Sequence, residues 1–150
     1  MKAFRHLIWI LAVAAIAFSF SLAAQESAVR FGAVDIYVDS KDQPLAAYQL
    51  EFSAPGSDLK ITGIEGGEHP AFSRPPYYDP KAMQQERVII AAFSTNTVDN
   101  LPVGKTRVAT IHFQLRGAAT PEFQLKLAVA ADARGNKIHA EVSARERKPK

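Results

Sequence analysis

The chain has 150 residues, no cysteine and a formal net charge of +3 at pH 7. Without cysteines there is no disulfide framework, so an apolar core must hold the fold. The positive charge lies at the two ends, because Lys2 and Arg5 precede an apolar run and the last six residues, "RERKPK", carry four bases and one acid. Residues 25–144 therefore have a net charge of −2 (+3 − 2 − 3), which argues against a nucleic-acid-binding surface.

The N-terminal segment has the three regions of a signal peptide. A short basic head is followed by the uncharged run "LIWILAVAAIAFSFSL" and then by small residues. Ser21 and Ala23 satisfy the small-x-small rule for a cut after Ala23, and a cut after Ala24 is the alternative. We therefore expect residues 1–24 to be a signal peptide and the protein to be secreted, either extracellular or periplasmic. The alternative is an uncleaved membrane anchor, although the run is shorter than the ~18 residues of a spanning helix.

Residues 25–144 are expected to form one domain, and its first half contains three segments in which apolar and polar residues alternate. "AVDIYVD" (33–39) places Val34 and two further apolar residues on one face, and Asp35, Tyr37 and Asp39 on a solvent-facing side. After a turn, "AYQLEFSA" (47–54) and "LKITGI" (59–64) show the same pattern. This period of two predicts strands that are each buried on one face.

The stretch "GGEHPAFSRPPYYDP", residues 66–80, shows no helical or strand period and has two interpretations. In the first it is a recognition loop for a carbohydrate or a partner protein, because exposed aromatic rings and arginine suit such contacts. In the second it is a proline-stiffened connection that covers one end of the core. We expect a division, with Phe72 and one of the two tyrosines structural and with Arg74 and the other tyrosine outward. The candidate binding residues are His69, Phe72, Arg74, Tyr77 and Tyr78.

The second half contains one short helical turn, "PKAMQQE" (80–86), and four further strand candidates. They are 87–94, which is apolar on both faces, then 108–115, 123–130 and 137–144. In 123–130 we expect Phe123, Leu125, Leu127 and Val129 to point inward. "DARGN" (132–136) predicts a tight hairpin. The expected core residues are Leu50, Phe52, Ile61, Ile90, Ile111, Phe113, Leu125 and Leu127.

Seven short strands and no long helix predict an all-β fold, in which two antiparallel sheets pack face to face as a β-sandwich. The basic end, residues 145–150, is expected to be a disordered, solvated tail. The alternative for this tail is contact with an anionic surface such as lipid or a cell-wall polymer.

Several segments together resemble a cohesin domain, from the superfamily that also includes the family 2 and family 3 cellulose-binding modules. Cohesins have a segment of the type "a-Y-x-L-x-F/Y-D-P-x-x-L", and "AAYQLEFSAPGSDL" occupies its place. The matching residues are Tyr48, Leu50, Phe52, Pro55 and Leu59, whereas Ala54 replaces the usual aspartate and one extra residue precedes Leu59. "RVIIAAFS", "LPVGK" and "RVATIHFQL" follow in the family's order, so the resemblance covers about residues 32–143.

The resemblance implies a non-catalytic module with two alternative uses. Cohesins bind dockerin modules through a sheet face, and related modules bind polysaccharide. No family contact motif is matched residue by residue, so no binding residue is carried over. The expected partner is therefore a protein or, as the alternative, an extracellular polysaccharide. The only tryptophan, Trp9, lies in the signal segment, so the domain lacks the tryptophan strip typical of crystalline-cellulose binders.

No residue pattern points to catalysis or to a bound metal. Nothing resembles a nucleophile elbow or a metal-binding helix motif, so we expect a non-enzyme without a cofactor. His112 and His139 would approach a common zinc ion only if their strands were neighbours, with His69 or Glu141 as a third ligand. Asp132 and Asn136 offer oxygens to calcium, but the same side chains satisfy the amides of a hairpin turn.

Overall fold

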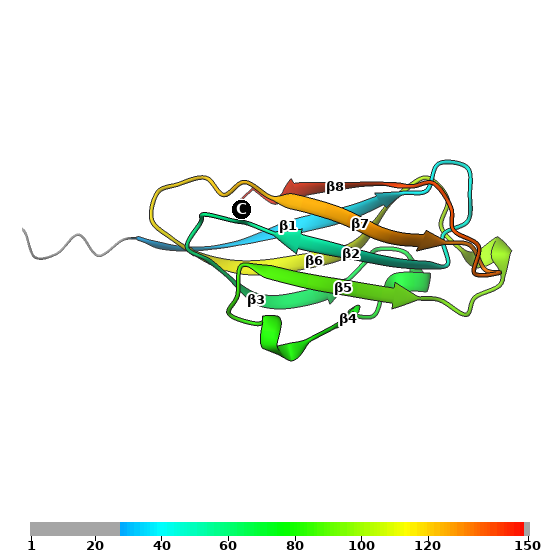
Figure 1. Ribbon diagram of the computed structural model, residues 1–150, viewed down its shortest axis with the longest axis horizontal. Coiled ribbons are helices and arrows are strands. Elements are labelled where there is room, and N and C mark those ends of the chain that lie inside the picture. The colour runs from blue at the N-terminus through cyan, green and yellow to red at the C-terminus, as the bar shows by residue number, and fades with distance from the viewer. Residues whose placement is uncertain (1–27, 149–150) are drawn as a thin grey trace, which may run out of the picture.

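A computed structural model describes residues 28–148, which form two antiparallel four-stranded sheets packed face to face (Figure 1). The predicted β-sandwich is thus confirmed. The strands are β1 (Val29–Asp39), β2 (Ala47–Ser53), β3 (Leu59–Gly66), β4 (Tyr77–Tyr78), β5 (Arg87–Phe93), β6 (Lys105–Arg116), β7 (Gln124–Ala131) and β8 (Glu141–Glu146). Three short 3₁₀ helices, η1 (Pro70–Phe72), η2 (Pro80–Ala82) and η3 (Val98–Asn100), lie in the loops.

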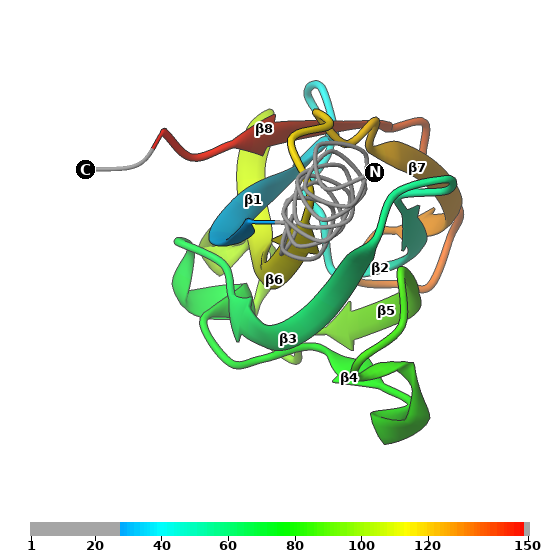
Figure 2. The same ribbon diagram turned by 90° about the vertical axis from the view of Figure 1, so that its left-hand side faces the viewer.

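The strand orders are β3-β6-β1-β8 in one sheet and β4-β5-β2-β7 in the other. The sequence predicted β1, β2 and β6 from their alternation, whereas β4 was not expected, because it lies inside the stretch 66–80. Figure 2 shows the sandwich end-on, with β8 and β4 at opposite edges. The expected signal peptide lies outside the described residues. Within 28–148, none of the helices is long and apolar enough to cross a membrane.

The core lies between the two sheets and contains most of the side chains that alternation predicted. Six of the eight expected core residues are fully buried: Leu50, Phe52, Ile61, Ile90, Ile111 and Phe113. Leu125 and Leu127 are only partly buried, although they pack against this cluster. Both lie in β7, which pairs only with β2 and forms an edge of its sheet, so fewer neighbours cover them.

One inward prediction in β7 is wrong because the strand contains a bulge. Leu50 pairs with Leu127 and Gln49 pairs with Val129, so Ala128 is an extra residue in the register. A bulge of this kind shifts the alternation by one residue. Val129 is therefore 42% exposed on the outer face, and Ala130 occupies the core position instead.

Two predictions about β8 and its surroundings also need correction. The "DARGN" turn forms, with a bridge between Ala131 and Lys137, but β7 and β8 belong to different sheets. The chain crosses between sheets after this turn, so the two strands are not a hairpin. The tail is not disordered from Arg145 onward, because β8 extends to Glu146 and pairs with β1.

Candidate interaction surface

Two adjacent glycines fix the start of the stretch 66–80 against the sandwich. A Cβ atom on Gly66 would lie 2.2 Å from the carbonyl oxygen of Ser73, and one on Gly67 would lie 2.2 Å from that of Arg107. Only glycine permits so close an approach of backbone to backbone. The Gly67 N–H also donates to the carbonyl of Phe72 at 2.7 Å, so the loop folds back on itself.

The middle of the stretch covers one end of the core. The Ala71 N–H donates to Nδ1 of His69 at 3.2 Å, so this imidazole caps η1. Phe72 is buried and packs edge-on against Tyr48, with ring centroids 5.4 Å apart. Tyr48 in turn donates its hydroxyl to the Val108 carbonyl at 3.2 Å, and burial raises the pKa of this phenol. This half of the stretch is therefore scaffold.

The two tyrosines face opposite ways, as expected from an extended segment after Pro75-Pro76. Tyr78 pairs with Ile90, is partly buried and packs against the core. Tyr77 pairs with Ala91 and is 71% exposed, and Arg74 is exposed as well. The predicted inward and outward orientations of the loop residues are confirmed.

Tyr77 does not stand alone on the surface. Its ring lies nearly parallel to that of Phe93, with 9° between the planes and 6.1 Å between the centroids, and Phe93 is 62% exposed. Beside this aromatic pair is a groove of about 640 Å³ between the loop and the end of β5. Phe72, Arg74 and Tyr77 line it, together with Phe93, whereas His69 and Tyr78 are not among its lining residues.

The aromatic pair belongs to a larger apolar area on the outer face of sheet β4-β5-β2-β7. The register places Tyr77 beside Ala91, Ala91 beside Gln49 and Gln49 beside Val129, which forms one row across four strands. Ile89, also exposed, is two residues before Ala91 on the same face. We call this area, defined by Tyr77, Phe93, Ile89 and Val129, the apolar face. The sequence signals for it were Tyr77 among the candidate binding residues and the apolar character of 87–94 on both sides.

The apolar face has a charged border. Arg87 Nη2 and Glu51 Oε2 form an ion pair across β5 and β2, and Lys126 pairs with Glu51 in the register of β7. The hydrogen bond with Arg87 is the first cause of the lowered pKa of Glu51, and burial opposes it. Apolar centre and charged rim are the usual composition of a protein-binding surface.

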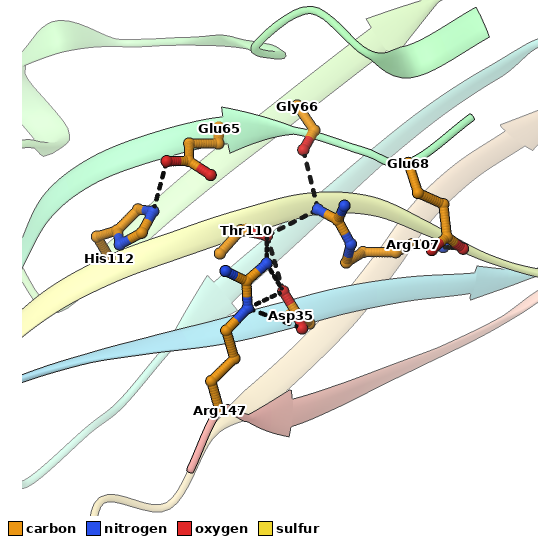
Figure 3. Close-up of polar contacts among 8 residues, drawn as sticks. All are labelled: Asp35, Glu65, Gly66, Glu68, Arg107, Thr110, His112 and Arg147. Atoms are coloured by element: carbon orange, nitrogen blue, oxygen red, sulfur yellow. Dashed lines mark hydrogen bonds and ion pairs between the residues drawn. The ribbon is translucent and has the colours of Figure 1, made fainter. Parts of the chain in front are cut away.

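On the outer face of the other sheet, the area around Asp35 is polar, and its side chains bind one another (Figure 3). Thr110 on β6 is fully buried and donates to Oδ1 of Asp35 on β1 at 2.7 Å. Arg147, just beyond β8, donates from Nε to both carboxylate oxygens of Asp35 at 3.0 Å. Arg107 donates to Thr110 Oγ1 at 2.9 Å and to the Gly66 carbonyl at 3.2 Å. Asp35 is therefore covered, where alternation predicted a solvent-facing side chain.

Opposing effects set the pKa of the Asp35 carboxyl. Burial raises it, but hydrogen bonds from Arg147 and Thr110, together with the positive charges of Arg147 and Arg107, outweigh burial. The net pKa lies below its ordinary value, so the group is a carboxylate at neutral pH. Asp35, Thr110 and Arg147 are bound to one another. Because Arg147 directly follows β8, these contacts attach the end of β8 to the sheet.

The metal alternatives do not match the geometry. His112 stands opposite Ala33 on β1, whereas Glu141, two residues after His139, stands opposite Asp39 at the end of β1. His112 therefore does not share a site with His139, and its Nε2 instead lies 3.0 Å from Oε1 of Glu65. Asp132 accepts hydrogen bonds from the amides of Arg134 and Asn136, so it has the predicted role in the turn rather than that of a calcium ligand. Among residues 28–148 no group of three or more histidine, cysteine or acidic side chains is placed to hold a metal ion.

No protein-family model matches the chain, and no curated protein matches it in sequence. Solved structures do match. A chain of a type I cohesin–dockerin complex from Clostridium thermocellum has a TM-score of 0.54 at 12% identity, over 77% of this chain and 84% of that one. A non-cellulosomal cohesin from Archaeoglobus fulgidus has a TM-score of 0.51 at 12% identity, over 76% and 75%.

A type I cohesin from Pseudobacteroides cellulosolvens also matches, with a TM-score of 0.53 at 9% identity over 78% of this chain and 77% of that one. At such identities the agreement concerns the fold. It agrees with the resemblance drawn from the order of the strand motifs. The described part of the chain, residues 28–148, has a cohesin-like β-sandwich fold.

Proposed function

We propose that this chain is a secreted, non-catalytic interaction module that binds a protein partner through the apolar face. The observation that carries the proposal is the exposed Tyr77–Phe93 pair, which continues into Ile89 and Val129 on the same sheet face. Exposed apolar side chains gathered on one sheet face with a polar border are typical of interaction sites, and tyrosine is enriched among the residues that contribute most to binding.

The chemistry of the surface describes the partner. Two nearly parallel rings require apolar side chains that cover them, and exposed Arg74 at the groove favours an acidic group nearby. The Clostridium thermocellum structure is a complex of a cohesin with a dockerin, so in that complex a domain of this fold binds another protein. That likeness supports a protein partner in general and does not identify one.

Variants with changed rings test this proposal. The chain, with Tyr77→Ala and Phe93→Ala variants, is used to capture proteins from the exported fraction of its own cells. Thr62→Ala, an exposed residue of β3 in the opposite sheet, is the control. We expect a partner that the parent and the control retain and that both ring variants bind about 30-fold more weakly, which corresponds to ~2 kcal/mol for a central contact. A partner that binds both ring variants as tightly as the parent would contradict the proposal.

Polysaccharide is the alternative ligand, and the same variants distinguish it. Cellulose and xylan suspensions would deplete the parent but not the ring variants if sugars stack on Tyr77 and Phe93. We expect no depletion, because this surface offers one pair of rings and the only tryptophan of the chain, Trp9, lies in the signal segment. If the suspensions remove the parent from solution and this removal requires both rings, the ligand is a polysaccharide and not a protein.

Export is part of the proposal and has its own measurement. The chain recovered outside the cytoplasm should have the intact mass of a protein that begins at Ala24 or Gln25, because the cut is expected after Ala23 or Ala24. If the chain is recovered in the membrane fraction and still begins at Met1, residues 1–24 are an uncleaved anchor instead.

A further inference from the structure

Strand β1 continues beyond the end of the strand beside it (Figure 1). β8 pairs with β1 only from Val34 to Asp39, and the last contact between them is the Arg147 N–H, which donates to the Ala33 carbonyl at 2.8 Å. From Val29 to Gly32, β1 pairs with β6 on one side. On the side where β8 ends, no residue among 28–148 forms a strand against this segment. We call this open edge the β1 slot.

Two backbone hydrogen bonds establish which backbone groups point into the β1 slot. In a strand, the N–H and C=O of one residue point to the same edge, and neighbouring residues alternate. The Ala33 carbonyl points toward β8, whereas the Ala28 carbonyl accepts from Gly117, which follows β6 on the opposite side. Val29 and Phe31 are four and two residues before Ala33, so their amides and carbonyls point to the same edge as the Ala33 carbonyl, which is into the β1 slot.

The β1 slot has a defined shape and is closed toward the core. Arg30 Nη1 and Glu146 Oε1 form an ion pair at 2.9 Å across its inner side, and the Arg30 guanidinium lies over the Phe113 ring, 5.8 Å from its centroid. A groove of about 290 Å³ separates the segment that includes Phe31 from the departing chain at Arg147 and Lys148. The space lies beside unpaired backbone, which is the geometry that an added strand requires.

The side chains around the β1 slot favour a particular kind of strand. Val29 and Phe31 project outward and are 49% and 72% exposed, so an apolar side chain on a neighbouring strand would cover them. Three bases (Arg30, Arg147 and Lys148) and one acid (Glu146) line the groove beside the β1 slot, a net charge of +2. A second copy would bring like charges together, whereas an acidic segment complements them.

The sequence itself disfavours occupation by the chain's own end. If β8 continued in register from Arg147 opposite Ala33, residue 149 would stand opposite Phe31. That residue is Pro149, which has no N–H to donate to the Phe31 carbonyl.

We infer that the β1 slot is a strand-addition site for an extended acidic segment of a partner protein. The segment pairs antiparallel to Val29–Gly32, in line with β8, and places an apolar side chain beside Phe31 and acidic side chains near Arg147 and Lys148. This site is separate from the apolar face, which lies on the other sheet. Loss of one site therefore leaves the other intact, and the two proposals fail independently.

Peptide titration followed by NMR tests the inference on the full-length ¹⁵N-labelled chain. The probe is a blocked hexapeptide of alternating valine and glutamate, and its control has lysine in place of glutamate. We expect the acidic peptide to shift the amide signals of Val29 and Phe31. The lysine peptide should bind about tenfold more weakly, a difference of 1.4 kcal/mol. Absence of a shift with the acidic peptide, or equal binding of both peptides, overturns the inference.

Two substitutions of one residue separate backbone pairing from side-chain contact. Phe31→Pro removes the N–H that points into the β1 slot and leaves the bonds from β1 to β6, whereas Phe31→Ala keeps that N–H. We expect the proline variant to bind the acidic peptide about tenfold more weakly than the alanine variant does. Val29→Pro, near the start of the strand, repeats the test if Phe31→Pro unfolds the chain.

The same variants identify other occupants. Binding to anionic phosphatidylglycerol vesicles is compared for the parent and both Phe31 variants. If the parent binds and both variants bind equally weakly, the Phe31 ring contacts a membrane. Shifts of the Val29 and Phe31 amides with protein concentration alone would show a second copy. Either result overturns the acidic-strand inference.

Discussion

The Asp35 network should contribute measurably to stability, and Asp35→Asn is the perturbation that tests it. The side chain of Asp35 is 13% exposed and accepts hydrogen bonds from Thr110 and Arg147. Hydrogen bonds to a charged group contribute about 1.5–3 kcal/mol each when buried. Arg147 is 44% exposed and can turn to water, which reduces its share. We therefore expect the substitution to lower the free energy of unfolding by about 2 kcal/mol at pH 7.

The pH dependence of this loss follows from the direction of the pKa shift. Burial raises the pKa of Asp35, but Arg147, Thr110 and Arg107 lower it further than burial raises it, so the folded pKa is below the unfolded one. Such a group stabilises the fold above the unfolded pKa of about 3.9, and the contribution is lost as the pH falls through the folded pKa. The asparagine variant has no proton to gain there, so its difference from the parent should narrow below about pH 4.

Urea unfolding of both chains between pH 7 and pH 3 measures this effect, with Asp42→Asn, an exposed carboxylate, as control. Arg147→Gln completes a double-mutant cycle, in which we expect a coupling energy of about 1 kcal/mol or more. A loss below about 0.5 kcal/mol at pH 7 would show that the network adds nothing beyond an ordinary surface contact. A loss of 2 kcal/mol that stays constant down to pH 3 would assign the effect to packing and refute the electrostatic reasoning.

Two further predictions concern the core and the stretch 66–80. Phe113→Ala should lower the free energy of unfolding by about 3–5 kcal/mol, because the ring is fully buried and packs against Phe123; an unchanged urea midpoint would contradict this. Phe72→Ala should cost about 3 kcal/mol or more, whereas Tyr77→Ala and Arg74→Ala should each cost less than about 1 kcal/mol. Thermal melts compare the three variants, and equal losses would mean that the stretch does not divide into scaffold and surface.

The fold could be predicted from sequence because its information is local. Alternation in β2 and β6 placed Phe52 and Phe113 in the core, since a strand with one covered face must carry apolar residues at every second position. The opposite orientations of Tyr77 and Tyr78 were also predictable, because Pro75-Pro76 imposes an extended backbone on the residues that follow.

The remaining features depend on contacts that a local pattern does not contain. Asp35 is covered by Thr110 and Arg147, which are 75 and 112 residues away in the chain. The bulge at Ala128 depends on the register with β2, and it moves Val129 from the core to the surface. The exposure of Phe93 depends on which face of β5 the other sheet covers, and a strand that is apolar on both faces leaves that open.

The two outer faces differ in what a partner would have to remove from water, and this difference indicates which face is available for binding. On sheet β3-β6-β1-β8, Asp35, Thr110 and two arginines already satisfy one another. An apolar partner surface that covered their half-exposed charges would add a desolvation cost that no new bond offsets. On sheet β4-β5-β2-β7, contact with Tyr77, Phe93 and Ile89 releases water from apolar surface, and each buried Å² contributes about 25 cal/mol. Partner binding should therefore respond to substitutions of the rings and stay unchanged in Asp35→Asn, as long as that variant remains folded.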